Sequence, residues 1–465
     1  MVWAKTDAGT WRDEYDGAEK VFYQMSQAFK RHYREHGSVY AICRIRITDH
    51  AGIGPGPLLG EKLMQAWARL RFDFPGLAVY EDGGKKTYLE ATTANIKLWI
   101  NDTFWIDDQA DAARHIVTGL HLRKLPCLVF VSRSSEVLFH CSHWRIDALG
   151  ACMVLDRLFS ILARLAEGTM PESLESPSRE LEYERLPISL EDAYGSATIP
   201  TPKTEATAEE IRQRNFITAY PSAGLLYKGD KSDPPKASRC QTVTFTKDQS
   251  EQFIRACKTR GFTVTATVHA ACAASVLGSK ETNDCSVDTY CDSYSTVVSV
   301  DLRPLLPGTA STYACGTYVT GITHTLQRGD DFESWCRQLT SGYRGDWDPS
   351  SYMDALRSIY RIHGETLADL AASGARPPAS NVTVSSLGVI DDKYLRADHG
   401  VIQVEAFHLG STILGRQPTL YIWTFRDCLT LSVDYNEAYY SVDQVSSLLD
   451  GIGSCLAKEM GVDMC

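Results

Sequence analysis

The first 123 residues alternate between segments with helical and with strand-like spacing of apolar positions. Within residues 13–36 apolar side chains recur at helical spacing, which predicts an amphipathic helix. Residues 39–47, VYAICRIRI, alternate in the manner of a strand. The turn-rich segment 51–60 separates this strand from a second predicted helix over 61–72, and residues 108–123 predict mixed helix and turn.

A predicted hairpin and a long apolar helix follow and enclose a short polar segment. Residues 125–131 and 136–143 form two apolar strand patterns, with the turn at residues 133–135. Residues 148–165 are rich in Leu, Met, Val, Phe and Ile, which predicts a largely buried helix. The segment 143–147 is therefore expected where a strand ends and a helix begins.

From residue 168 to residue 240 Pro, Ser, Glu and Lys replace the apolar periodicity, and this composition predicts a long connection with a few short ordered pieces. Periodic segments resume near Gln241. Strands are predicted at 242–245, 296–302, 317–325, 381–386, 401–409, 418–424 and 428–434, and helices at 247–259, 265–277, 331–343 and 441–458. The pattern indicates a mixed α/β protein with an N-terminal lobe at 1–195, a linker or crossover at 196–240 and a C-terminal lobe at 241–465.

Composition narrows the function classes. The formal net charge of −11 on 465 residues disfavours general binding to nucleic acid or to an anionic membrane surface. The 14 cysteines form no CxxC pair and no zinc-finger spacing, so no metal site is predicted and buried thiols in a reducing compartment are expected. With no signal-peptide pattern and no run of ~18 apolar residues, we expect a cytoplasmic protein without membrane segments.

The candidate chemistry lies in His143-Trp144-Arg145-Ile146-Asp147, the only HxxxD match in the chain. An imidazole at a strand end is suited to general-base chemistry because its pKa lies near neutrality. Asp147 suits the N-cap position of the following helix. By itself the pattern is weak, since a histidine at a strand end is more often a surface or core residue; His140 and His269 are expected to be such packing residues.

Residues 142–148, SHWRIDA, resemble the HHxxxDG motif of the superfamily that contains peptide-synthetase condensation domains, chloramphenicol acetyltransferase and the BAHD acyltransferases. Ser142 stands in place of the first His and Ala148 in place of the Gly. BAHD enzymes do not need the first His, so the departure favours a free-standing acyltransferase. The resemblance implies an α/β (α+β) fold of two chloramphenicol-acetyltransferase-like lobes with mixed sheets and a tunnel at their interface.

Further matches extend the resemblance through the second half of the chain. Residues 298–304, VSVDLRP, resemble the family strand that ends in an arginine, which implies that Arg303 pairs with Asp147. Residues 313–318 correspond to a Gly-containing segment that follows it. Residues 384–388, VSSLG, resemble a segment of fungal and yeast alcohol acetyltransferases, and the BAHD DFGWG motif is not visible. The opening at residues 11–19 is similar to that of fungal trichothecene 15-O-acetyltransferase-like proteins.

The resemblance implies an acyltransferase that moves an acyl group, acetyl above all, from acyl-CoA to a hydroxyl of a fungal secondary metabolite. His143 would be the general base and Asp147 a structural residue. Ser385 or Ser386 are candidate oxyanion donors, and Tyr421 and Trp423 are a candidate aromatic wall for the acceptor. Acyl-CoA would be a co-substrate, with no bound cofactor, no metal, no partner beyond the two small molecules, and a monomeric chain.

Two other functions fit the same residues. The enzyme would act on a carrier-protein thioester in a condensing or releasing step, or the same fold would serve as a cyclase, an isomerase or a ligand-binding protein that consumes no acyl donor. The acceptor, the acyl length and the regiochemistry depend on the shape of the cavity, which a single sequence does not specify.

Overall fold

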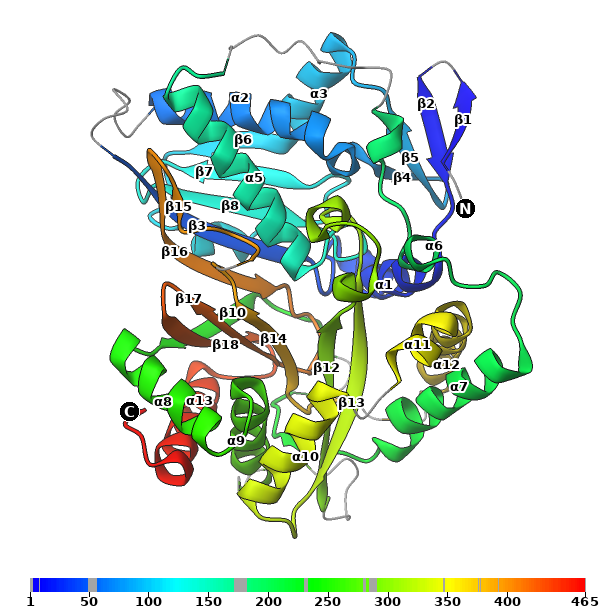
Figure 1. The fold of residues 1–465 in the computed structure, drawn as a ribbon, viewed down its shortest axis with the longest axis vertical. Coiled ribbons are helices and arrows are strands. Elements are labelled where there is room, and N and C mark those ends of the chain that lie inside the picture. Colours follow the sequence, from blue (N-terminus) through cyan, green and yellow to red (C-terminus); the bar gives the residue numbers. More distant parts are fainter. Residues whose placement is uncertain are drawn as a thin grey trace. The chain divides into compact units, whose positions relative to one another are not determined.

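The computed structural model describes residues 3–7, 9–48, 57–170, 182–229, 233–278, 282–283, 291–345, 348–374, 376, 378–391 and 393–464. The chain forms two compact units (Figure 1). Unit 1 comprises Met1–Gly195, Arg303–Tyr318 and Ile390–Ser411. Unit 2 comprises Ser196–Leu302, Val319–Val389 and Thr412–Cys465.

Unit 1 is built on a six-stranded sheet of order β15-β16-β3-β8-β7-β6. Its strands are β3 (Val39–Ile47), β6 (Phe104–Asp107), β7 (Cys127–Val131), β8 (Glu136–Cys141), β15 (Asp398–His399) and β16 (Ile402–Ser411). Helices α2 (Pro57–Asp73) and α5 (Ala148–Ala166) pack against each other and against this sheet, and α4 (Ala113–Val117) contacts β3 and β8. Both faces of β7 are buried, which explains its continuous apolar sequence CLVFV.

A second sheet of order β1-β2-β5-β4 lies in the same unit. It consists of β1 (Ala4–Asp7), β2 (Thr10–Asp13), β4 (Tyr80–Asp82) and β5 (Lys85–Leu89). The remaining helices of unit 1 are α1 (Gly17–Gln27), α3 (Thr93–Thr103) and α6 (Leu190–Tyr194). Because β2 leads directly into α1, this sheet fixes the start of the helix that reaches the candidate site.

Unit 2 contains a six-stranded mixed sheet of order β10-β18-β17-β14-β12-β13. Its strands are β10 (Ser238–Thr244), β12 (Ser293–Asp301), β13 (Val319–Gln327), β14 (Thr383–Val389), β17 (Thr419–Phe425) and β18 (Cys428–Asn436). Helix α9 (Val264–Gly278) contacts this sheet and packs against α8 (Lys247–Thr259), α10 (Phe332–Arg344) and α13 (Val442–Met460). The unit also holds α7 (Pro202–Arg212), α11 (Pro349–Asp354), α12 (Leu356–Ser373) and the short pair β9 (Gly224–Leu225) and β11 (Thr282–Asn283).

The two mixed α/β units confirm the predicted fold class. Their division along the chain differs from the linear lobes at 1–195, 196–240 and 241–465. Residues 303–318 and 390–411 belong to unit 1. The second of these segments contains β16, which pairs with β3 over nine registered residue pairs, from Ile402↔Ile47 to Ser411↔Val39. The segment 196–240 belongs to unit 2 and contains α7, so its described part is more ordered than a linker.

Several predicted elements need correction. The helix expected over 13–36 is shorter, because Asp16 adopts an extended backbone and caps α1 by accepting from the Gly17 N–H. The turn-rich segment 51–60 lies outside the described residues up to position 56, and positions 57–60 already belong to α2. Helices α3, α11 and α12 and the small sheet of unit 1 were not predicted.

In the described part of the chain no single helix combines the length and apolar character needed to cross a membrane. Helices α8 and α9 pass such a test only as a pair, and they are bent by 97° at the break between them.

Candidate functional site

His143 lies in unit 1, two residues after β8 and five residues before α5. Its half-buried imidazole stacks on the ring of Phe22 in α1, with centroids 4.3 Å apart and planes within 8°. Its main-chain carbonyl accepts a hydrogen bond of 2.8 Å from Thr317 Oγ1. Both the ring and the backbone of this residue are therefore held in place by segments far away in sequence.

The surroundings of His143 favour its neutral form. Burial lowers the pKa of the imidazole, and the negative charge of Asp147 and the backbone of His143 itself oppose this shift in part. The Nδ1 atom is buried and has no hydrogen-bond partner on another described residue. A neutral imidazole at physiological pH retains the lone pair that a general base requires.

Asp147 is fully engaged by its own structural neighbours. Asp147 is the N-cap residue of α5, and its Oδ1 accepts a hydrogen bond from the Gly150 N–H at 2.9 Å. Its Oδ2 accepts from the Tyr318 N–H at 2.9 Å. Arg303 Nη2 donates to both carboxylate oxygens at 2.9 Å. The carboxylate thus joins three chain segments, and its pairing with Arg303 is the contact that the resemblance implies.

Arg303 is the cation of this buried ion pair. Its side chain is 1% exposed, and that of Asp147 is 4% exposed. Nε and Nη2 also donate to the Tyr313 carbonyl at 3.1 and 3.0 Å, and the guanidinium lies 5.1 Å from the centre of the Tyr318 ring. A buried charge pair is tolerated when its remaining groups are hydrogen-bonded, as they are here.

The segment Tyr313–Tyr318 packs directly on the HxxxD motif. The Asp147 N–H donates to the Gly316 carbonyl at 3.2 Å, and a β-carbon on Gly150 would lie 2.2 Å from the carbonyl oxygen of Ala314. Gly316 has φ +139°, and a β-carbon there would lie 2.5 Å from the Tyr318 ring. Glycine is required at position 150 because the two backbones approach so closely, and at position 316 because of its positive φ and the neighbouring Tyr318 ring.

The buried carboxylate of Glu35 also lies next to the motif, and it was not identified from the sequence. Ser142 Oγ donates to Glu35 Oε2 at 2.8 Å, and Glu35 Oε1 is buried without a hydrogen-bond partner among the described residues. Burial raises the pKa of Glu35 to about 7, against the opposing effects of Ser142 and Arg145. Ser142, the residue before His143, therefore contacts a titratable group.

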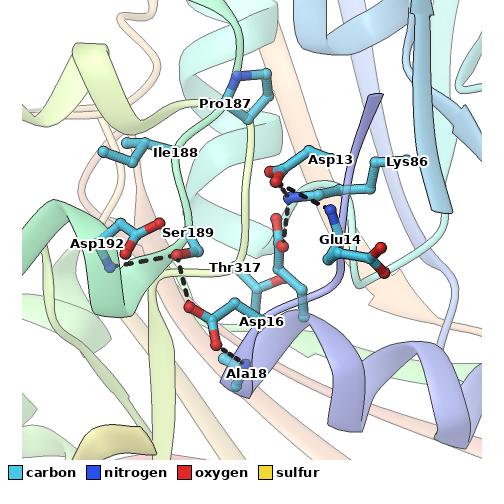
Figure 2. Close-up of polar contacts among 12 residues, drawn as sticks. Asp13, Glu14, Asp16, Ala18, Lys86, Pro187, Ile188, Ser189, Asp192 and Thr317 are labelled. Atoms are coloured by element: carbon cyan, nitrogen blue, oxygen red, sulfur yellow. Dashed lines mark hydrogen bonds and ion pairs between the residues drawn. The ribbon is translucent and has the colours of Figure 1, made fainter. Parts of the chain in front are cut away.

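A second group of charges holds the start of α1. Lys86 of β5 is buried and forms an ion pair of 2.9 Å with Asp13 (Figure 2). It forms a second ion pair, of 2.6 Å, with Glu19 of α1. The Ala18 N–H at the first turn of α1 donates to Glu191 Oε1 at 2.9 Å. Phe22 follows Glu19 by three residues on the same helix, so these contacts help to set where its ring meets His143.

The candidate residues of the second half lie in unit 2. Val384, Leu420 and Ile422 belong to its hydrophobic core, so alternation places Ser385, Tyr421 and Trp423 on the opposite face of the sheet. Ser386 points to the core face, where its Oγ shares a 2.7 Å hydrogen bond with Thr265 Oγ1. The four residues therefore do not act as one group on one face, and their roles in the reaction stay predictions.

The two predicted packing histidines occupy packing sites. His140 is buried on β8, and its Nε2 shares a hydrogen bond of 3.0 Å with Ser38 Oγ. His269 is buried on α9, where its Nδ1 lies 2.6 Å from the Tyr343 hydroxyl and burial lowers its pKa to about 3.

The chain is similar over its whole length to known fungal proteins. No family model matches the chain. O-acetyltransferase pigM of Monascus ruber is 36% identical over 474 residues, spanning 100% of this chain and 88% of that protein. Azaphilone biosynthesis cluster protein M of Aspergillus terreus is 31% identical, with 97% of this chain and 96% of that protein covered.

Among solved structures, TRI3 trichothecene 15-O-acetyltransferase from Fusarium sporotrichioides superposes with a TM-score of 0.79 over 98% of this chain and 97% of that chain. At 19% sequence identity this likeness shows the fold. The full-length similarity at 36% identity shows that the chain belongs to the family of the fungal O-acetyltransferase pigM.

Proposed function

We propose that the protein transfers an acetyl group from acetyl-CoA to a hydroxyl group of a fungal secondary metabolite, with His143 as the general base. The observation that carries the proposal is the half-buried imidazole of lowered pKa, stacked on Phe22 and held by Thr317 at the end of β8. The names of the related acetyltransferases support acyl transfer as the reaction.

In the proposed reaction, Nε2 of His143 accepts the proton of the acceptor hydroxyl as its oxygen attacks the thioester carbonyl. A proton on Nδ1, next to the backbone of His143, leaves Nε2 as the basic nitrogen. The tetrahedral intermediate then breaks its C–S bond, and the imidazolium returns the proton to the leaving CoA sulfur. General-base help of this kind contributes typically ~10²–10⁴-fold, and no covalent acyl-enzyme is needed.

The rest of the proposed site serves position and charge. Asp147 holds the loop between β8 and α5 and makes no contact with substrate. Ser385 and Ser386 are the candidates for oxyanion stabilisation, and Tyr421 and Trp423 are candidates for the acceptor wall. Ser386 already shares its hydroxyl with Thr265, so Ser385 is the better candidate of the two.

The relatives favour an oxygenated polyketide as the acceptor. One of them is named for an azaphilone biosynthesis cluster, and it matches 97% of this chain at 31% identity. The trichothecene enzyme resembles the chain in fold at 19% identity and therefore carries less weight for the acceptor. We infer that hydroxylated azaphilones are the first acceptors to test.

The test follows CoA release from acetyl-CoA with a thiol-reactive dye, using hydroxylated azaphilones and terpenoids as acceptors. His143→Ala is expected to lower acceptor-dependent release ~10²–10⁴-fold. His121→Ala, at an exposed histidine of the same unit, is the matched control and is expected to keep full activity. Release that persists in His143→Ala contradicts the assignment of the base.

The same assay separates the alternatives. If acetyl-CoA is not consumed but an acyl-pantetheinyl carrier protein is, the donor is a carrier protein. If the acceptor is converted with no acyl donor, the protein is a cyclase or isomerase, and if it is bound unchanged, a binding protein.

A further inference from the structure

A cavity of about 530 Å³ lies in unit 1, among residues of α2, α3 and the segments 78–80 and 122–125. Its volume falls in the range of small-molecule sites. None of its lining residues belongs to the HxxxD motif or to the segment Tyr313–Tyr318. It is therefore a feature that the proposed reaction does not use.

The cavity is lined by a buried guanidinium, that of Arg71, which forms no ion pair with any residue that the structure describes. Arg71 is 2% exposed, and its Nη2 donates to the Leu89 carbonyl at 2.8 Å. Its Nε and Nη1 atoms are buried and have no hydrogen-bond partner within the described residues. The guanidinium lies 5.8 Å from the centre of the Tyr88 ring and 5.7 Å from that of Trp99.

An arginine in this state is costly unless an anion reaches it. A buried charge left without a partner strongly destabilises a protein. The Tyr88 hydroxyl interacts with Arg71 and donates to the Glu182 carboxylate, and Arg71 itself forms no ion pair with the described residues. The Nε and Nη1 groups of Arg71 could therefore donate hydrogen bonds to a ligand that carries a negative charge.

Two further cations line the same cavity. Arg123 contributes a buried Nε atom that has no partner among the described residues, and Lys124 contributes an exposed ammonium group. Asp102 is the acidic residue in the lining, and it is exposed. The cavity thus carries an excess of positive charge in a protein whose formal net charge is −11.

Part of the cavity lining is apolar and partly exposed. Leu98 on α3 is 63% exposed, and Leu89 and Leu122 are each 37% exposed. Neighbouring leucines that face solvent beside a cavity are typical of a ligand site. Leu98 and Trp99 follow each other on α3, so the apolar rim and the ring next to the guanidinium come from one helix.

We propose that this cavity binds an amphipathic organic carboxylate, with its carboxylate on Arg71 and its apolar body against Leu98 and Leu122. A carboxylate matches a single buried guanidinium, because planar N–H donors pair well with its two oxygens. A dianionic phosphate would need more donors at the same depth. The apolar rim excludes purely inorganic anions as the preferred ligand.

The test is isothermal titration calorimetry on the full chain with octanoate, and with octanol as the neutral probe of the same length. Octanoate is expected to bind, and octanol to bind at least ~10-fold more weakly because it cannot neutralise Arg71. Leu98→Glu places a negative charge at the exposed rim and is expected to weaken octanoate binding at least ~10-fold. Leu367→Glu, at an exposed leucine of α12, is the matched control.

Arg71→Met tests the guanidinium directly, and Leu98→Glu keeps the proposal testable if that variant does not fold. Equal binding of octanoate and octanol would overturn the proposal, because the cavity would then be apolar only. Absence of octanoate binding to the wild type, or unchanged binding in Leu98→Glu, would overturn it as well.

Discussion

The buried pair of Asp147 and Arg303 is expected to be the most sensitive point of unit 1. We predict that Asp147→Ala, Arg303→Met and the double variant each lower the free energy of unfolding. Asp147→Ala removes four hydrogen-bond acceptances at once, two from main-chain N–H groups and two from Arg303. Arg303→Met removes the cation but leaves the carboxylate with both N–H donors.

The magnitudes follow from what each substitution leaves behind. Asp147→Ala leaves a buried guanidinium that still donates to the Tyr313 carbonyl but has lost the counter-charge of Asp147, which costs about 3–5 kcal/mol. Loss of the α5 cap adds about 1 kcal/mol, so the total is about 4–6 kcal/mol. Arg303→Met is expected to cost less, because the Gly150 and Tyr318 N–H groups still stabilise the carboxylate. The double variant is expected to be less destabilised than the sum, by about 0.5–3 kcal/mol.

Urea denaturation of the four proteins, followed by circular dichroism, measures these differences. The m-value should stay constant, so that the midpoints report stability. The reasoning is refuted if Asp147→Ala costs less than about 1 kcal/mol, or if the two single effects add fully, because either result means that the ion pair does not act as a unit.

Three further predictions concern the neighbours of the motif. Phe22→Ala is expected to lower kcat about 10–100-fold and to move the acidic limb of the pH–rate profile upward, because less burial raises the pKa of His143; an unchanged profile contradicts this. Gly150→Ala should destabilise by about 1–3 kcal/mol in thermal unfolding, although alanine favours helices, because its β-carbon would lie 2.2 Å from the Ala314 carbonyl oxygen; greater stability would rule out this packing. The raised pKa of Glu35 means that the folded state holds its proton more tightly, so its contribution to stability is present below pH 4.5 and is lost as pH rises to about 7. Glu35→Gln should therefore gain stability relative to wild type over that window, on the order of 3 kcal/mol by urea denaturation, and a pH-independent difference would contradict the shift.

The elements predicted best from sequence have strong local periodicity. The strand over 39–47 agrees with β3 at both ends, and the helices at 247–259 and 148–165 agree with α8 and α5 to within a residue. In these segments the buried face repeats at the spacing of the element, so the local pattern and the tertiary environment give the same answer. Helix α12 is half exposed and lacks such a stripe of buried positions, which is why the pattern did not show it.

The membership of segments in the two units could not be predicted in this way. The strand over 401–409 was predicted, yet nothing in its sequence shows that its partner is β3, some 360 residues earlier. Pairing between distant strands depends on how the whole chain folds, and the local pattern of one strand does not identify its partner. The same holds for residues 303–318, which leave unit 2 at Arg303 because the guanidinium reaches its counter-charge in unit 1.

The candidate site divides along the same line. The HxxxD spacing fixes His143 and Asp147 relative to each other, and Arg303 was named through the resemblance to known acyltransferases. Phe22 and Glu35 were missed because neither stands in a motif; each acts through one contact that only folding creates. Both bear on protonation, since Phe22 helps to bury the imidazole and Glu35 is a titratable group next to its loop. The residues of the motif therefore indicate the type of reaction. The pH at which the proposed reaction operates depends on neighbouring residues that the motif does not contain.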